Sequence, residues 1–404
     1  MTLARVLFTV VALFVALGAT AEEAPIRLEP SSVVADAGDG ISVRLKLSRA
    51  VPYRLSLLDG PPRVVIDLDG VDHRSLNEIE LDQSEHVLSL RTGRVQKGWS
   101  RLVLDLDGPY TLTEAGETVL DDGATIVIGL SVASVEEFRA AVVRGRDAVA
   151  ATSATGADIA NSPQKSRQTG DKPLVVMIDP GHGGIDPGAE AGGLVEAAVI
   201  LDFAIELAAH LRAAGMVVDM TRAEDDFVPL ETRVSLARSA GADVFLSLHA
   251  DTISEGVANG ATIYTLSDAA SDSASARLAE AHDRADLLAG VDLAGQDDLL
   301  ASVLMDLSRQ ETAPRSDRLA ERLADAIAAA GIRMHRHPIQ KAGFSVLKAP
   351  DIPSVLIEVG FLSSKADRAR ITDPLWRRAL QEAIGKALQV WAVEDAAEAR
   401  LLRQ

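Results

Sequence analysis

At about 150 residues per domain, the 404 residues of this chain suffice for two or three domains, and 47% of them are hydrophobic, enough for more than one core. The 40 Lys and Arg against 59 Asp and Glu give a net charge of −19, and only 3% of the residues are aromatic. This argues against nucleic acid as a partner, because phosphate binding needs basic residues and base stacking needs aromatic ones. The chain contains no cysteine, which excludes disulfides, thiolate metal sites and cysteine nucleophiles.

The first residues are typical of an export signal. Arg5 precedes an apolar run over 6–17, and small residues follow at 19–21. Because this run is shorter than the roughly 20 residues of a membrane-spanning helix, we expect a secretory signal peptide over 1–21, cleaved after about Ala21, rather than an uncleaved anchor. No later stretch is long and apolar enough to span a membrane, so we expect no transmembrane segment in the mature protein.

The next region, 25–133, alternates apolar and polar residues. In 41–47, Ile, Val and Leu occupy every second position with basic residues between them, which predicts a half-buried antiparallel strand. Two segments, 63–70 and 101–108, resemble each other. Their similarity suggests two related sheets packed face to face, although two strand-and-turn segments can also be alike by chance.

The composition then changes twice. We expect a linker over 134–172, which begins with a possible helix at 135–149 and continues with small and polar residues that cannot bury a face. From 173 to 395, short apolar strands alternate with amphipathic helices. The expected strands lie at 174–178, 216–220, 244–248 and 355–359, and the expected helices at 196–214, 230–240, 315–330 and 374–392. This pattern predicts an α/β domain with a mostly parallel twisted sheet flanked by helices, preceded by a small all-β domain of two sheets.

Four residues with metal-binding or catalytic side chains lie where these expected elements begin or end. His182 lies in a glycine-rich loop after the first strand, Glu196 begins a helix, and His249 and Glu358 end buried strands. A buried carboxylate is costly unless it is paired, binds a metal or takes part in catalysis. Two His and one Glu leave zinc a fourth position for water, and a second Glu supplies a base.

Each residue taken alone allows another interpretation. The loop of His182 resembles a phosphate-binding loop, although it lacks a Gly-Lys-Ser/Thr motif. Glu196 alone suits the positive end of a helix dipole, and His249 suits a hydrogen-bonded core position. The spacings of 14, 53 and 109 residues along the chain match no local metal motif, so only the fold can bring the four together.

The residues around these positions resemble the zinc-dependent N-acetylmuramoyl-L-alanine amidases of the cell wall. The matching segments are Asp-Pro-Gly-His-Gly-Gly-Ile-Asp-Pro-Gly-Ala at 179–189, Glu196, Ser-Leu-His-Ala-Asp at 247–251 and Leu-Ile-Glu-Val-Gly-Phe-Leu at 356–362. The resemblance implies that His182, Glu196 and His249 bind one Zn²⁺ and that Glu358 is the catalytic carboxylate, which accepts a proton from the attacking water and passes it to the leaving nitrogen. Region 25–133 resembles the AMIN domain of periplasmic cell-division amidases, which implies targeting to peptidoglycan at the division site.

The implied reaction is hydrolysis of the amide bond between N-acetylmuramic acid and L-alanine, which splits septal peptidoglycan so that daughter cells separate. The implied location is the periplasm. Two alternatives remain: a catalytically inactive wall-binding division scaffold, and a zinc peptidase that acts on the stem peptide. The complete set of four matched residues favours the amidase over the scaffold.

A segment at 267–316 exceeds what the catalytic fold needs, and loop insertions of this length are usually functional. It carries two expected helices, at 274–288 and 297–309. It resembles the regulatory insertion of the division amidases, in which a helix occludes the zinc site until an activator of the inactive zinc-endopeptidase type displaces it. His282, with Glu280 and Asp283 beside it, lies where relatives often carry a Glu that reaches the zinc. The alternative is a solvated acidic helical hairpin.

Three further residues are candidates for contacts with the substrate or with the metal ligands. Asp251 follows His249 by two residues, and Arg222 and Arg233 occur at positions that match the family. The resemblance implies that they orient the site or the substrate. For Arg233, a charge on a helix surface is the simpler interpretation.

Overall fold

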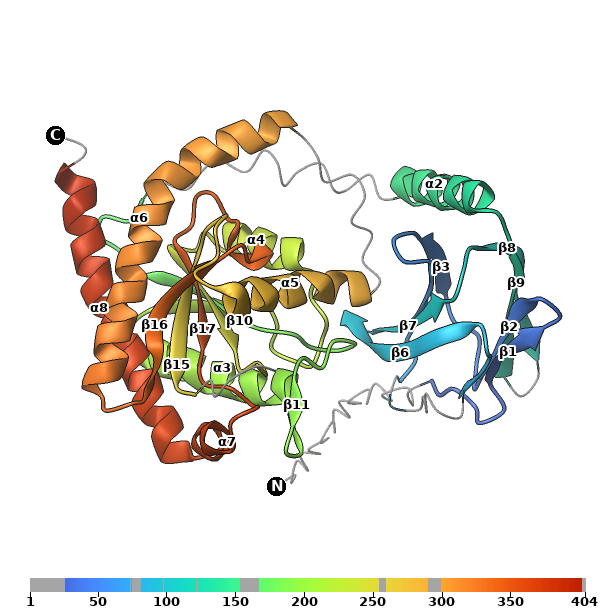
Figure 1. Ribbon diagram of the computed structural model, residues 1–404, viewed down its shortest axis with the longest axis horizontal. Coiled ribbons are helices and arrows are strands. Elements are labelled where there is room, and N and C mark those ends of the chain that lie inside the picture. The colour runs from blue at the N-terminus through green and yellow to red at the C-terminus, as the bar shows by residue number, and fades with distance from the viewer. Residues whose placement is uncertain are drawn as a thin grey trace, which may run out of the picture.

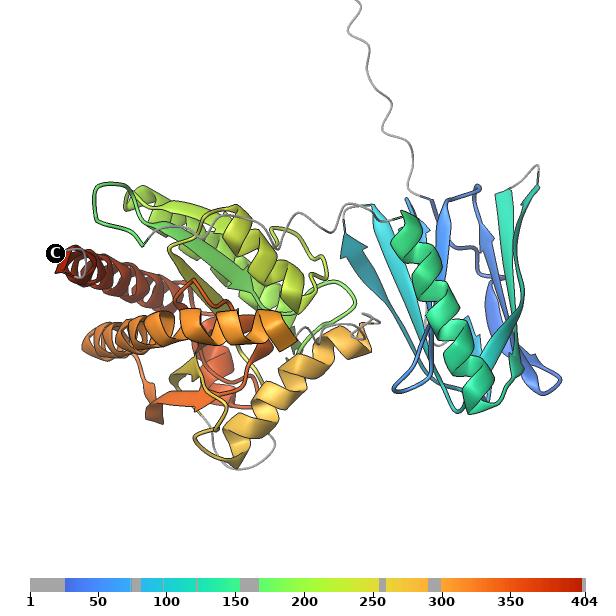
Figure 2. The ribbon, with the colours of Figure 1, turned by 90° about the horizontal axis from the view of Figure 1, so that it is seen from above.

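Two domains of different composition follow one another along the chain, a β-rich N-terminal domain and an α/β domain (Figure 1). The computed structural model describes residues 26–72, 74, 81–96, 98–120, 123–152, 167–253, 259–289 and 299–401. The signal peptide expected at 1–21 lies outside these ranges. Figure 2 shows the two domains side by side, with the end of the C-terminal helix, in red, at the edge of the α/β domain that faces away from the N-terminal domain.

The N-terminal domain is a sandwich of two sheets. One sheet has the order β5-β1-β2-β9-β8 and the other β3-β4-β7-β6. The strands are β1 (Val33–Ala37), β2 (Gly40–Leu47), β3 (Tyr53–Leu58), β4 (Arg63–Asp69), β5 (Asp82–Gln83), β6 (Val87–Gln96), β7 (Trp99–Leu106), β8 (Tyr110–Leu120) and β9 (Gly123–Val132). Alternate residues of β2 are fully buried against the other sheet, as the period of two predicts.

The repeated segments do not lie in two different sheets, so that part of the prediction is wrong. They form β4 and β7, which are antiparallel neighbours in one sheet. In this register Arg63 lies opposite Asp105 and Asp67 opposite Arg101, and Arg101 Nε lies 2.6 Å from Asp67 Oδ1. The similar sequences thus place opposite charges across from each other in the ladder.

Both described ends of the region expected as a linker are held by a domain. Helix α2 (Val135–Thr152) packs on β3 and β8 of the sandwich and buries Phe138 and Val142. At the other end, Arg167 Nη2 lies 2.8 Å from Asp395 Oδ1, on the C-terminal helix. Residues 153–166 lie outside the described ranges.

The α/β domain contains a six-stranded sheet of order β13-β10-β14-β17-β15-β16. Every neighbouring pair is parallel except β15 and β17, which agrees with the predicted mostly parallel sheet. The strands are β10 (Val175–Pro180), β13 (Val217–Met220), β14 (Val244–His249), β15 (Ala261–Leu266), β16 (Met334–Ala342) and β17 (Ser354–Glu358), with a small hairpin of β11 (Glu190–Ala191) and β12 (Leu194–Val195).

Helices cover both faces of this sheet, as predicted. The helices are α3 (Glu196–Ala213), α4 (Leu230–Ser239), α5 (Ser273–Leu288), α6 (Leu299–Ala329), α7 (Lys365–Ile371) and α8 (Pro374–Leu401), with a 3₁₀ turn η3 (Ser345–Leu347). In β10, Val176 and Ile178 face the core under α3, α6 and α8, whereas Met177 faces α4, α5 and η3. None of the helices in the described ranges combines the length and apolar character that crossing a membrane requires.

Two features of this domain differ from the sequence expectations. Strands β15 and β16 were not expected; β16 is an edge strand with exposed basic residues and a proline, a composition that obscures strand character. The helices expected at 297–309 and 315–330 form one helix, α6, which runs through Pro314. Packing of its second half against α8 and β15 keeps it continuous.

Candidate active site

Four predicted residues meet at the carboxyl edge of the sheet. The parallel register places His249 of β14 beside Glu358 of β17, and α3 begins at Glu196. Glu196 Oε1 lies 3.3 Å from His182 Nε2 and 3.1 Å from His249 Nδ1. Two ligands of a tetrahedral zinc ion, each about 2.0–2.1 Å from the metal, are about 3.4 Å apart. These two separations match that spacing, and ligand atoms of the two imidazoles lie within 4.8 Å of each other.

Glycines bring the loop of His182 close to the other ligands. A side chain at Gly181 would place its Cβ 2.1 Å from His249 Cε1, and one at Gly188 would lie 2.6 Å from the His182 ring. His182 itself has a φ of 58°, the only positive φ outside glycine in the described residues. The glycine-rich sequence thus serves close backbone approach around the imidazoles.

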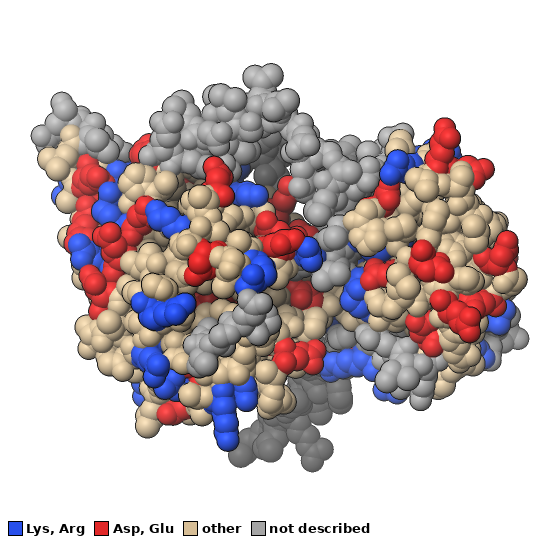
Figure 3. Space-filling view, viewed as in Figure 1, with Lys and Arg blue, Asp and Glu red and all other residues tan. Residues whose placement is uncertain are grey.

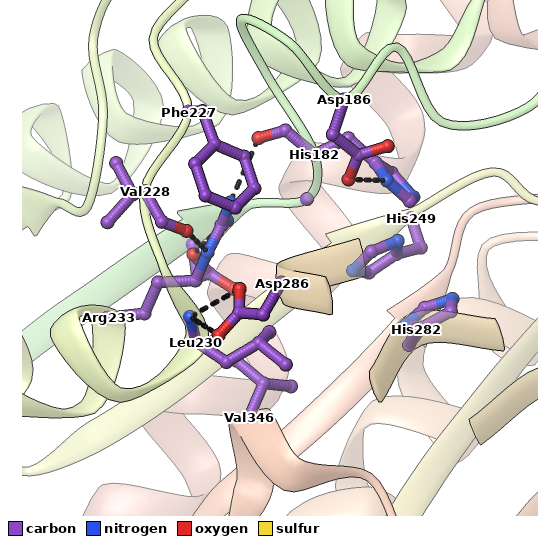
Figure 4. A pocket seen from close by; sticks show the side chains of 12 residues that line it. His182, Asp186, Phe227, Val228, Leu230, Arg233, His249, His282, Asp286 and Val346 are labelled. Atoms are coloured by element: carbon purple, nitrogen blue, oxygen red, sulfur yellow. Dashed lines mark hydrogen bonds and ion pairs between the residues drawn. The ribbon is translucent and has the colours of Figure 1, made fainter. Parts of the chain in front are cut away.

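Asp186, which was not among the predicted site residues, orients His182. Its Oδ2 lies 2.7 Å from His182 Nδ1 (Figure 4). This contact leaves Nε2 directed to the shared site, as the carboxylate partner of a metal-binding His does. The available signal was the Asp-Pro-Gly that follows His182 four residues later.

Arg222 and Arg233 bind the backbone of the loop that carries His182. Both are buried, 4% and 3% exposed. Arg222 donates to the backbone oxygens of Pro180 and Gly181 at 2.9 and 2.7 Å, and Arg233 donates to that of His182 at 3.0 Å. The interpretation of Arg233 as a surface charge is therefore wrong, because the loop covers it and a buried carboxylate pairs with it.

That carboxylate is Asp179, at the end of β10. It accepts hydrogen bonds from Arg233 Nη1 at 2.8 Å, Thr221 Oγ1 at 2.6 Å and Ser247 Oγ at 2.7 Å. Burial would raise the pKa of Asp179, but Arg233 and these hydrogen bonds outweigh it and lower the pKa below its usual value. Asp179 thus links β10, β14 and Thr221, which directly follows β13, to α4. It lies beneath the glycine-rich loop 181–189 that carries His182, called the metal-site loop below.

Two buried atoms at the site have no hydrogen-bond partner among the described residues, His182 Nε2 and Glu358 Oε1. The other carboxylate oxygen of Glu358 accepts the N–H of Asp251 at 3.1 Å. Such atoms require an explanation, and an ion or water held between them is the usual one. The residues present therefore fit a bound cation.

The charges of the site support the same conclusion. Burial lowers the pKa of His249 to about 4, and the charge of His282 adds to this shift, so His249 is neutral, the form that binds metals. Burial alone would raise the pKa of Glu196, but His182 outweighs it and lowers it well below its usual range. Glu196 is thus an anion that a cation would neutralise. Burial, followed by the charges of Asp251 and Glu196, raises the pKa of Glu358 well above its usual range.

A second grouping of ligand atoms overlaps the predicted one. Atoms of His182, His249, Asp251 and His282 all lie within 4.8 Å of one another. This group includes His282 of α5 and Asp251 but not Glu196, which lies against the two His nitrogens from α3. The described cluster is compatible with metal binding through either set.

Of the three regulatory candidates on α5, only His282 faces the site. It is 4% exposed, its ring centroid lies 4.1 Å from that of His249, and its Nε2 contacts Asp251 Oδ2. Glu280 is exposed and pairs with Arg284. Asp283 accepts the N–H of Ser345, at 2.9 Å, and so attaches α5 to η3.

Helix α5 divides the space around the site. The cavity enclosed by His182, His249, His282, Arg233 and Asp286 measures only about 20 Å³ (Figure 4). A second cavity of about 410 Å³ is lined by His182, Asp251 and His282. The first cavity holds little more than one water, so no substrate fits there with α5 in this position.

Comparisons with known proteins identify the family. A family model described as N-acetylmuramoyl-L-alanine amidase matches residues 176–390, and the AMIN domain model matches 33–128. The chain is 31% identical over 356 residues to the N-acetylmuramoyl-L-alanine amidase AmiC of Neisseria meningitidis, covering 85% of each protein. It is 28% identical over 399 residues to AmiC of Escherichia coli, covering 96% of this chain and 93% of that protein.

Among solved structures, the amidase AmiC2 of Nostoc punctiforme matches 56% of this chain and 98% of its own chain, with 27% identity and a TM-score of 0.40. The family model covers more than half of the sequence, and its match spans all four of the residues that meet at the sheet edge. This chain belongs to the N-acetylmuramoyl-L-alanine amidase family and carries an AMIN domain ahead of its catalytic domain.

Proposed function

We propose that this chain hydrolyses the amide bond between N-acetylmuramic acid and L-alanine in peptidoglycan. One observation carries the proposal: side chains from four separate segments meet at one sheet edge, and His182 Nε2 and Glu358 Oε1 are buried there without a hydrogen-bond partner in the described residues. A cation and a water molecule bound between these atoms would satisfy both.

The ion is proposed to be zinc, one per catalytic domain, held by His182, Glu196 and His249. Asp186 supports this role because it bonds to Nδ1 of His182 and leaves Nε2 for the metal. When bound, zinc lowers the pKa of a water molecule toward about 7 and polarises the substrate carbonyl. Asp251, Arg222 and Arg233 are assigned to orienting this site.

Glu358 is the proposed general base and acid. It accepts a proton from the attacking water at Oε1 and passes it to the nitrogen of the departing L-alanine. The N–H of Asp251 holds its other oxygen at 3.1 Å, which fixes the carboxyl group for this transfer. Burial and neighbouring carboxylates raise the pKa of Glu358, and a cation bound beside it would favour the ionised form that accepts this proton.

The enzyme is further proposed to be autoinhibited. His282 contacts Asp251 and lies against His249, and the cavity that His249 and His282 line together with Arg233 measures only about 20 Å³. Imidazole is itself a zinc ligand, so His282 can occupy a position that water and substrate need. A protein activator of the inactive zinc-endopeptidase type that binds region 267–316 would open the site by displacing α5.

The proposed location is the periplasm, with activity at the septum during daughter-cell separation. Export through residues 1–21 and recognition of peptidoglycan by the AMIN domain would place the enzyme there. Acidic groups stand on the visible face of the N-terminal domain, and both charges are mixed on the larger domain (Figure 3). With a net charge of −19, general electrostatic attraction to an anionic wall polymer is absent, so binding to the wall depends on specific contacts.

The test combines metal content with product analysis. Purified protein is expected to hold one zinc ion and to release intact stem peptides, with L-alanine at their free amino end, from peptidoglycan sacculi in a chelator-sensitive reaction. Metal-free protein that releases nothing would instead indicate a wall-binding scaffold. Fragments cut within the stem peptide would indicate a peptidase.

The autoinhibition has its own test. His282→Ala is expected to raise the basal release of stem peptide several-fold, because it removes the imidazole beside His249. Glu280→Ala is the matched control on the exposed face of the same helix and is expected to leave the basal rate unchanged. Equal basal rates for His282→Ala and the parent protein would contradict the closure.

A further inference from the structure

The outer face of the β3-β4-β7-β6 sheet covers the rim of the active site. Leu58, Val65 and Val103 on this face form one buried cluster with Ile185, Phe227 and Ala289 of the α/β domain. Val65 and Val103 point away from the core of the sandwich, yet they are 3% and 0% exposed. A sandwich strand usually keeps one face polar, and burial on both faces requires a second cover.

We propose that this outer face is the docking surface for the metal-site loop and for the end of α5, and that docking keeps α5 closed over the site. The inference rests on the proposed closure by α5 and adds the segment of this chain that maintains it.

The backbones of β6 and of the loops around the active site are in direct contact. The edge strand β6 accepts a hydrogen bond from the N–H of Phe227 at Arg94 O, 3.1 Å away. A Cβ added at Gly93 would lie 2.2 Å from Ile185 Cα, and one at Gly184 would lie 2.0 Å from Arg94 O. The two backbones therefore touch directly, two or three residues from His182.

Arg94 of β6 forms ion pairs with the α/β domain. Arg94 Nη2 lies 2.9 Å from Glu224 Oε2, and Arg94 Nε lies 2.9 Å from Asp226 Oδ1. These carboxylates belong to the segment that leads from β13 to α4. The pairing fixes the orientation of the sheet on the rim, since each arginine nitrogen needs its own acceptor.

Arg101 of β7 contacts the residue that follows α5. Arg101, already paired with Asp67 at 2.6 Å, donates from Nη1 to the backbone oxygen of Ala289 at 3.0 Å. Ala289 directly follows α5, where a positive charge is favourable to the helix dipole. Both Figures 1 and 2 show this end of α5 pointing at the sandwich. His282 lies seven residues earlier, about two helical turns.

The consequence is a connection between domain position and site access. If the sandwich separates, Ile185, Phe227 and Ala289 lose their apolar cover and the end of α5 loses Arg101. The remaining described contacts of α5 with the catalytic domain, such as those of Asp283 and Asp286, then hold the helix alone. Opening of α5 becomes easier, and the basal activity rises.

The test introduces a side chain at the direct contact. Gly93→Leu forces the domains apart, whereas Gly116→Leu, on β8 with nothing within 4 Å of its added Cβ, is the matched control. Because the chain has no cysteine, Leu88→Cys and Leu375→Cys, both exposed, label one site in each domain for energy transfer. Hydrogen exchange of residues 273–289 reports the opening of α5.

The expected result for Gly93→Leu is reduced energy transfer, amide exchange in α5 at least tenfold faster, and basal peptide release several-fold faster, with Gly116→Leu like the parent. Separated domains with α5 exchange within twofold of the parent would overturn the inference. If Gly93→Leu fails to fold, Arg94→Glu replaces it. Adding Asp226→Arg to Arg94→Glu is expected to restore docking. An Arg94→Glu variant with α5 exchange like that of the parent would equally overturn the inference.

Failure of the proposed closure is distinguishable. In that case amide exchange in α5 rises in Gly93→Leu, but neither this variant nor His282→Ala changes the rate of peptide release. That result would support docking of the sandwich on α5 and would contradict its control of activity.

Discussion

Asp179 touches no candidate metal ligand through its side chain, yet the loop that carries His182 depends on it. Its carboxylate is 1% exposed and is the buried partner of Arg233. Removing one member of a buried ion pair costs about 3–5 kcal/mol, because the other charge is left uncompensated. Asp179→Asn is therefore expected to lower the free energy of unfolding by about this amount, measured by denaturant unfolding. Asp219→Asn, an exposed carboxylate on β13, is the control; equal stability of the two variants would contradict the assignment.

Glu358 is expected to affect turnover without affecting metal content. Glu358→Gln keeps the shape of the side chain but cannot accept the proton, and loss of a general base typically costs about 10²–10⁴-fold. Peptide release should fall by this factor while zinc content stays at the parent level. Glu382→Gln on the exposed side of α8 controls for the substitution itself. Peptide release at the parent rate would refute the proton-transfer role.

Single residues differed in how well the sequence could predict them. His182, Glu196, His249 and Glu358 could be proposed because each lies just after an apolar strand or at the start of a helix, within segments that resemble the amidase family. Arg233 was assigned to a surface because its burial depends on a loop fifty residues earlier in the chain. No local pattern carries that information.

At the scale of elements, α5 is attached through a carboxyl group whose charge depends on pH. Asp286 accepts the N–H of Leu230 at both oxygens, at 3.1 and 3.0 Å. Burial raises its pKa to about 6; Glu231 and Asp186 add to the shift, while the hydrogen bond and Arg233 oppose it. A carboxyl group with a raised pKa in the closed state binds its proton more tightly there. Closure is therefore fully favoured below about pH 4 and weakens as the pH rises to about 6.

Energy transfer between labels at Glu280→Cys and Ser239→Cys measures this closure. The parent is expected to show a smaller closed fraction at pH 7 than at pH 5. Asp286→Asn keeps an acceptor for Leu230 but does not titrate, so this part of the pH dependence should disappear. A pH profile unchanged by the substitution would assign the effect to other groups.

Helices and strands could be predicted from sequence periodicity where one face of the element is exposed to water. The expected helix at 274–288 corresponds closely to α5 (Ser273–Leu288), because it has an apolar face and a polar one. The prediction divided helix α6 into two helices; Pro314 lies inside α6, and a proline within a helix is tolerated where tertiary packing opposes the break. Its packing on α8 is a long-range contact that the sequence does not display.

For the whole molecule, a metal bound only to the folded state must increase its stability. At a free concentration about 1,000 times the dissociation constant, the gain is about 4 kcal/mol, which corresponds to a rise of the unfolding temperature on the order of 10 °C. Chelation is expected to lower the unfolding temperature of the parent, measured by calorimetry. His182→Ala should unfold at a temperature that no longer responds to chelator; a full response there would place the ion elsewhere.

The arrangement of the two domains was not predicted, although the sequence carries a signal for it. Both Val64-Val65-Ile66 and Leu102-Val103-Leu104 are continuously apolar, which a sandwich with a solvated outer face does not need. The runs indicate that both faces are covered, but not by what. Only the fold supplies Phe227 and Ala289 as the cover.

The anchored ends of the connecting chain limit how far the domains can travel. Thr152 ends a helix packed on the sandwich, and Arg167 is paired with Asp395 and Glu398 of α8. The fifteen peptide steps between them span at most about 50 Å. A sandwich that has released the catalytic rim thus remains within reach of it, and its return is a first-order event whose rate is independent of enzyme concentration.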